Sequence, residues 1–174
     1  MSDLSQLASL LKSRNTVDSK IAAIIGCPTH VQDVGAHIAS AIFGIILEES
    51  ASHDGSDGKF SRGPLAGRSV ALQWYTKREG SLSLKTDTSI DYYLVLAGPK
   101  NVPPSNFNPW VIESVFLFNA KQLLMALRER NVQIGTRTSV INALWDRAEI
   151  YPNQTNRTLV LSSEQRASLA LFQT

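Results

Sequence analysis

Residues 48–79, EESASHDGSDGKFSRGPLAGRSVALQWYTKRE, decide how this chain folds. The first half of the stretch holds acids and glycines, which build turns. Its second half, VALQWYTK at residues 70–77, mixes apolar and polar side chains as a strand does. We therefore expect a glycine-rich turn that leads into a strand over residues 67–77. This layout is typical both of a solvated hairpin and of a metal-dependent site for phosphodiester chemistry.

The composition is that of a folded globular domain. The chain has 174 residues, of which 43% are hydrophobic and 18% charged, and a net charge of +2. We expect a single domain over residues 1–174, with an N-terminal helical segment (1–30), a core (31–130), and C-terminal helices with an edge strand (131–174). The single cysteine excludes an internal disulfide. No signal-peptide pattern or membrane-length apolar run is found, so we expect a cytoplasmic protein without a membrane partner.

Apolar periodicity and capping residues predict the remaining elements. Helices are expected over residues 2–14, 16–25 and about 32–47, the second of them capped by Asn15 and Thr16. Strands are expected over residues 91–97 and 111–118, the first of them covered on both faces because it is apolar throughout. Asn119 is expected to cap a helix to Arg130, and Ser162 with Gln165 to form a capping box. A helix from Thr138 or Ser139 to residue 148 and an edge strand over 158–161 complete an α/β or α+β fold around a mixed sheet of about four strands.

Cations are concentrated between residues 59 and 85. Against the single acid Glu79, this segment holds six cations: Lys59, Arg62, Arg68, Lys77, Arg78 and Lys85. Phosphate contacts supply most of the non-specific affinity for nucleic acids, so the excess favours a DNA-facing edge. A solvated loop with scattered cations explains it equally well.

The order of elements, together with the GSDG turn and the following VALQ strand, resembles the core of the restriction-endonuclease-like, or PD-(D/E)XK, nuclease superfamily. In that family an acid at a strand turn and an acid-x-lysine pair on the next strand meet at one end of the sheet. Asp57 matches the first acid, while Ala71 stands at the second acid position and Gln73 at the lysine position. The strings SASHDGSDG, GPLAGR, WYTKREG and DYYLVLAGPK are also similar to an uncharacterised prokaryotic domain family, which implies no mechanism.

The nuclease resemblance implies a Mg²⁺-dependent DNA endonuclease or a degenerate, inactive relative. Asp57 would hold the metal with Glu49 or Asp91, because Ala71 offers no ligand. Gln73 and Lys77 would orient water or phosphate. Four cations would contact the DNA backbone: Lys59, Arg62, Arg68 and Arg78.

Two other functions remain open from the sequence. The protein could be a non-enzymatic DNA-binding module whose N-terminal helices dock on DNA, with the sheet used for a homodimer or for ligand sensing. The Gly-Cys-Pro-Thr-His joint at residues 26–30 is somewhat like a helix-turn-helix, but its second helix is mostly apolar. The other function is a structural or partner-binding domain with no role on nucleic acid.

Overall fold

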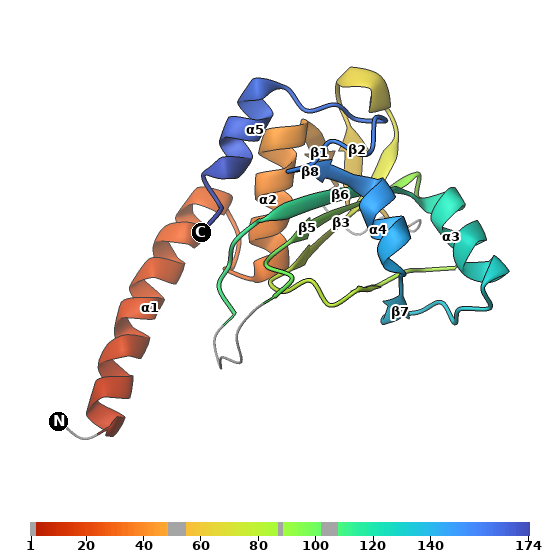
Figure 1. The fold of residues 1–174 in the computed structure, drawn as a ribbon. Helices are drawn as coiled ribbons and strands as arrows, with labels where there is room; N and C mark the ends of the chain where they lie inside the picture. The colour runs from red at the N-terminus through yellow and green to blue at the C-terminus, as the bar shows by residue number, and fades with distance from the viewer. Residues whose placement is uncertain (1–2, 49–54, 87–88, 102–107) are drawn as a thin grey trace.

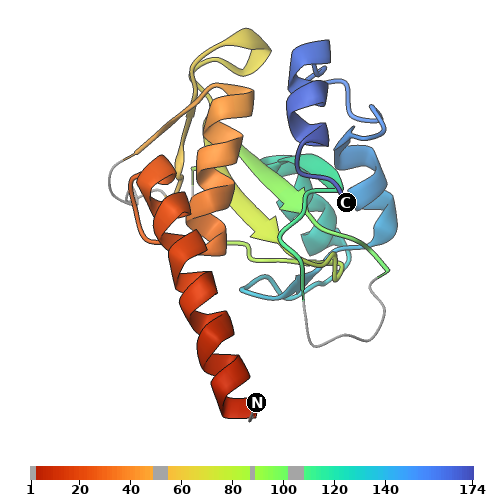
Figure 2. The same ribbon diagram turned by 90° about the vertical axis from the view of Figure 1, so that its left-hand side faces the viewer.

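A computed structural model describes residues 3–48, 55–86, 89–101 and 108–174. These residues form a mixed sheet between two layers of helices, with a long N-terminal helix that projects from one side (Figures 1 and 2). The helices are α1 (Asp3–Ile25), α2 (Val31–Phe43), α3 (Ala120–Glu129), α4 (Asn142–Ala148), α5 (Ser163–Ala170) and the 3₁₀ turn η1 (Gly63–Leu65). The strands are β1 (Ile45–Leu47), β2 (Gly58–Phe60), β3 (Ser69–Tyr75), β4 (Ser81–Leu82), β5 (Tyr92–Ala97), β6 (Ser114–Asn119), β7 (Thr138–Ser139) and β8 (Glu149–Tyr151).

The main sheet has six strands in the order β1-β2-β3-β5-β6-β8, so the expectation of about four strands was wrong. All neighbours are antiparallel except β3 and β5, which run parallel from Val70 opposite Tyr92 to Tyr75 opposite Ala97. A parallel pair requires the chain to return to the start of the sheet between its strands. The chain makes that return between Tyr75 and Tyr92, and β4 in the described part of this segment, residues 76–86 and 89–91, pairs with β7 in a separate two-stranded sheet.

The two faces of the sheet bury separate cores. On β5 and β6 successive side chains alternate between them, as strand geometry requires. Leu94, Leu96, Val115 and Leu117 pack with α2 and α5, whereas their neighbours, among them Phe116, pack with α3 and α4. The expectation that residues 91–97 form a strand covered on both faces is confirmed.

The third expected helix stops early because of Gly44. This residue adopts the left-handed conformation, with φ of 65°, and its N–H donates to the Ser40 carbonyl, which ends α2. The apolar run then continues as β1, paired with β2. An apolar run of this length fits a buried helix and a strand equally well, so its periodicity alone does not divide it.

Two expected boundaries were wrong because side chains bond locally. Thr16 does not cap a second helix: its hydroxyl donates to the Lys12 carbonyl one turn back, and α1 continues unbroken. Thr138 bonds to the main chain of Gly135 and lies in β7, so α4 begins only at Asn142.

The C-terminal region also differs from expectation. Residues 158–161 form no strand, and the sixth strand is instead β8, which directly follows α4. The side chain of Gln154 satisfies the main chain of this segment by donating to the Leu159 carbonyl and accepting from the Leu161 N–H. The caps predicted at Asn119 and Ser162 are confirmed, since Asn119 caps α3 and Ser162 with Gln165 forms the capping box of α5.

Within the described residues, no helix combines the length and the apolar character that crossing a membrane requires.

Candidate functional site

The candidate site lies where β2 separates from β3. The two strands pair only at Gly58 with Val70 and at Lys59 with Ser69. Beyond that point the edge of β3 that faces away from β5 bonds to side chains instead of a strand. The Leu72 N–H donates to Asp57 Oδ2 at 2.6 Å, and the Asp57 N–H donates to the Val70 carbonyl at 2.9 Å. Asp57 is therefore held at the fork between the two strands.

Gln32, from the first turn of α2, continues the same edge one step further. Its Nε2 donates to the Trp74 carbonyl at 2.9 Å, and its Oε1 accepts from the Trp74 N–H at 3.1 Å. The Gln32 amide thus substitutes for one residue of a neighbouring strand. This contact orients α2 on the sheet next to the fork.

The carboxyl group of Asp57 has a perturbed environment. Partial burial removes water from it and raises its pKa above the usual value, while the Leu72 N–H and the positive charge of Lys85 act in the opposite direction. Lys85 belongs to the return segment between β3 and β5. That segment runs back over β3, with Leu82 and Leu84 buried against the sheet, and so brings the ammonium group toward Asp57.

Gln73 and Tyr75 point to the face of β3 that carries the return segment, and they fix this segment in place. Gln73 Nε2 donates to the Ser83 carbonyl at 2.7 Å, and Gln73 Oε1 accepts from the Tyr75 hydroxyl at 2.5 Å. The Tyr75 hydroxyl accepts in turn from the Ser83 N–H at 3.0 Å. Burial raises the pKa of Tyr75, and the Ser83 N–H partly offsets this effect. Both ends of the Gln73 amide are therefore engaged in holding the return segment.

Asp91 lies immediately before β5, where its carboxylate bonds within the protein. Oδ2 accepts from the Ser69 N–H at 2.9 Å and from the Ser69 hydroxyl at 3.2 Å, and Oδ1 accepts from Arg68 at 3.3 Å. The Asp91 N–H donates to the Ser69 hydroxyl. These bonds join the first residues of the parallel strands β3 and β5.

The structure locates two of the three predicted metal ligands, and these two do not lie together. Asp57 and Asp91 lie on opposite sides of β3, along β2 and β5 respectively, and Glu49 lies outside the described residues. Ala71 is buried in the core under α3 and α4. No group of three or more His, Cys, Asp or Glu side chains that could hold a metal occurs in the described parts of the chain.

The predicted cations occupy different environments. Lys59, Arg62 and Arg68 are exposed, with Lys59 paired to Glu48 at 3.9 Å. Lys77 is exposed in the bend after β3. It lies two residues after Tyr75, the last residue of β3. Asp57 bonds to Leu72, which is three residues, or about 10 Å at ~3.3 Å per residue, before Tyr75.

Arg78 is mostly buried. Its side chain exposes only 12% of its surface, and its guanidinium stacks over Phe116 and Trp145, with centroid distances of 4.9 and 5.1 Å. Asp146 approaches it at 3.9 Å. The position of Arg78 is that of a packing residue, with little surface to offer a phosphate.

Sequence reasoning missed three contributors to this region. Lys85 was counted among the cations, but only the path of the return segment places it near Asp57. Ser83 contributes main-chain atoms, for which no sequence signal exists. The sequence marks Gln32 only as the start of a helix, although an amide side chain in a first helical turn is able to reach a neighbouring strand.

Comparison with known proteins assigns no family or relative to the chain. A scan against protein-family models found none that matches the chain, and a search of curated proteins found no match.

Proposed function

We propose that this protein is a DNA-binding relative of the restriction-endonuclease-like nucleases in which the metal centre is eroded. The observation that carries the proposal is the carboxylate of Asp57 at the fork of β2 and β3, with the cation of Lys85 near it. The order of elements around the fork supports it, because α2 is followed by the antiparallel strands β1, β2 and β3 and then by a strand parallel to β3.

The described donors do not complete a magnesium site. Mg²⁺ requires near-octahedral oxygen ligands, and it is usually held by one or two carboxylates with water and phosphate. Asp57 would supply one carboxylate, Ala71 supplies none, and both oxygens of Asp91 are engaged by Arg68 and Ser69. An active divalent-metal-dependent endonuclease is the second candidate, and it would need a ligand such as Glu49.

Exposed cations near the fork support DNA as the partner. Lys59 lies on β2, two residues after Asp57, and Arg62 lies in the turn between β2 and β3, while Lys85 approaches from the return segment. Arg68 is exposed at the start of β3, although it is paired with Asp91. Each phosphate that such a cation neutralises releases counterions and gives binding a salt dependence.

The alternative in which the N-terminal helices read DNA receives less support. A recognition helix needs a free polar face to reach base edges. α2 instead buries Ile38, Ala39, Ile42 and Phe43 against the sheet. The exposed side of α1 carries leucines.

The salt dependence of DNA binding tests the location of the interface. We expect Lys59→Ala with Arg62→Ala to lower the slope of log K against log salt by about 2, at ~0.9 per phosphate contact in duplex DNA. The matched control neutralises two cations of α1, Lys12→Ala with Lys20→Ala, and should leave the slope unchanged. Absence of DNA binding at low salt, or an effect of the α1 pair alone, would overturn the proposal.

A plasmid-nicking assay with Mg²⁺ or Mn²⁺ tests the state of the centre. The eroded centre predicts binding without cleavage. Nicking by the parent protein that is lost in Asp57→Asn would instead establish an active endonuclease and contradict the proposal that the metal centre is eroded.

A further inference from the structure

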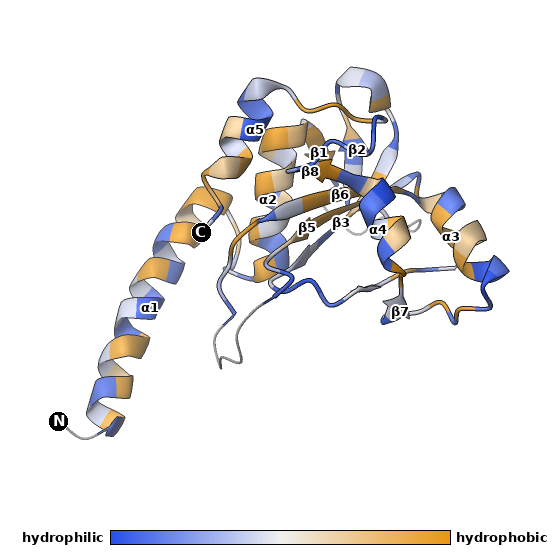
Figure 3. Ribbon diagram, viewed as in Figure 1, coloured by the Kyte–Doolittle hydropathy of each residue, from blue (hydrophilic) through white to orange (hydrophobic). Residues whose placement is uncertain are grey.

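Helix α1 is almost entirely uncovered. It has 23 residues and none of them is buried. Even its leucines are open to solvent, since Leu4 is 77% exposed and Leu10 is 59% exposed. Figure 3 shows hydrophobic residues repeated along the whole projecting helix. Helices gain most of their stability in proteins by packing an apolar face. An isolated helix with an exposed leucine stripe therefore indicates a missing partner.

The stripe on α1 has a heptad spacing, and two antiparallel copies of it are complementary in charge and apolar character. Positions separated alternately by three and four residues share one face of a helix. On α1 this series is Leu4, Leu7, Leu11, Arg14, Asp18, Ile21 and Ile25. In an antiparallel pair of α1 helices, the register that sets Arg14 against the second copy's Asp18 also sets Leu11 against Ile21 and Leu7 against Ile25. In a parallel pair, by contrast, Arg14 would face Arg14 and Asp18 would face Asp18.

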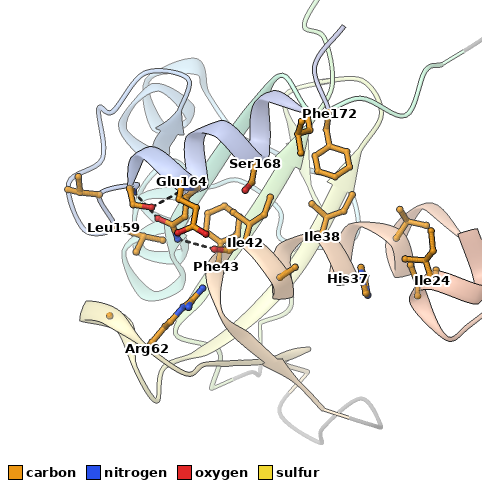
Figure 4. A pocket seen from close by; sticks show the side chains of 18 of the residues that line it. Ile24, His37, Ile38, Ile42, Phe43, Arg62, Leu159, Glu164, Ser168 and Phe172 are labelled. Carbon is orange, nitrogen blue, oxygen red and sulfur yellow. Dashed lines mark hydrogen bonds between the residues drawn. The ribbon is translucent and has the colours of Figure 1, made fainter.

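A large groove begins where α1 ends. Its volume is about 740 Å³, and it lies between α2 and α5, with Arg62 and Glu164 among its polar residues. In Figure 4 the side chains of Ile38, Ile42 and Phe172 line it, and Ile24 of α1 stands at one end. Ile21 and Ile25, the predicted partners of Leu11 and Leu7, line the same end.

We propose that α1 pairs in antiparallel orientation with α1 of a second copy of this chain, and that its leucine-bearing half enters the second copy's groove. The helix is continuous over 23 residues, so Leu4 lies about 30 Å from Ile24, at 1.5 Å per residue. The leucines therefore cannot reach the groove of their own chain. A two-fold axis would make both contacts reciprocal, as an isologous interface requires.

The proposed contact has the size of a stable interface. In this register residues 7–25 of the two helices overlap over about 28 Å, and at ~10 Å width each helix offers ~280 Å². Two such faces against each other give about 560 Å², and half of each helix in a groove adds about 700 Å². The total of roughly 1,250 Å² falls within the usual range for specific complexes, about 1,200–2,000 Å².

Sedimentation velocity of the full chain over a range of concentrations tests the pairing. We expect a dimer that Leu7→Glu with Leu11→Glu converts to a monomer. The control Ser9→Glu with Thr16→Glu adds the same charge on the opposite side of α1 and should remain dimeric. On the groove side Leu171→Glu should weaken association, since Leu171 is 80% exposed and lines the groove. A monomeric parent protein, or a dimer insensitive to the leucine or groove substitutions, would overturn the proposal.

Charge exchange tests the contribution of Arg14 and Asp18 to pairing, and disulfide trapping tests the orientation. Arg14→Asp alone should weaken the dimer, and Arg14→Asp with Asp18→Arg should restore it. With Cys27→Ser as background, Leu11→Cys with Ile21→Cys should give a covalent dimer on oxidation. The two positions lie about 15 Å apart on one helix, which prevents a bond within a chain. Efficient trapping by Leu11→Cys alone would show parallel pairing and contradict the proposal.

Discussion

Replacement of Gln32 by alanine should destabilise the protein by about 2 kcal/mol, although this side chain is exposed. The variant loses two hydrogen bonds to Trp74, a residue that is only 3% exposed. A hydrogen bond contributes about 1 kcal/mol net, and a buried group left without a partner costs ~1–3 kcal/mol. Because the Gln32 position is exposed, water can reach the freed groups, so the lower figure applies to each. The better helix propensity of alanine offsets only a few tenths of a kcal/mol.

Urea unfolding followed by circular dichroism measures this difference. We expect a lower midpoint with an unchanged slope, and a melting temperature lower by roughly 4–8 °C for a chain of this size. Gln6→Ala is the matched control, since Gln6 is an exposed glutamine on α1, and it should stay within about 0.5 kcal/mol of the parent. If Gln32→Ala behaves like Gln6→Ala, then the side-chain extension of β3 does not stabilise the fold.

Two further predictions concern Asp57 at the fork and Arg78, one of the four cations expected to contact the DNA backbone. The raised pKa of Asp57 means that the folded protein binds the carboxyl proton more tightly than the unfolded chain does, so protonation of Asp57 favours folding at low pH and this stabilisation is lost as pH rises through the folded pKa. Asp57→Asn should therefore gain stability relative to the parent as pH rises from 4 to 7. A stability difference in urea unfolding that stays constant over this range would contradict the prediction. Arg78→Ala should lower the free energy of unfolding by about 1–3 kcal/mol through lost stacking on Phe116 and Trp145, without altering the salt slope of DNA binding. Asp146→Ala, which removes the exposed partner of Arg78, should lower it by less than about 0.5 kcal/mol. Equal effects of the two variants in thermal melts would refute the packing role.

Local signals in the sequence predicted the elements whose ends carry their own chemistry. Asn119 and Ser162 cap helices with their side chains, and the apolar run of β5 marked a central strand. These features depend on residues that are close in sequence. Elements that depend on distant partners were missed or misassigned. The short strands β1, β2 and β8 exist because of their neighbours in the sheet, and Gln154 supplies bonds that an edge strand at residues 158–161 would otherwise need.

The same distinction applies to the candidate site. The sequence drew attention to Asp57 as an acid in a glycine-rich turn, and the structure places it at a strand fork. Gln73 and Tyr75 share a face of β3, as alternation along a strand requires, and a hydrogen bond joins their side chains. The proximity of Lys85 and the burial of Arg78 follow from how the return segment crosses the sheet. No pattern within residues 59–85 contained that information.

The packing of α5 on α2 has a consequence for synthesis on the ribosome. Gln165 Nε2 donates to the Ile42 carbonyl across 123 positions of sequence, and the Ile112 N–H donates to the Phe172 carbonyl. Leu169, on the same helix, is fully buried. The apolar face of α2 therefore emerges early in translation and stays without this cover until residues 163–172 have left the exit tunnel. During that interval the nascent chain exposes a surface of the kind that chaperones bind.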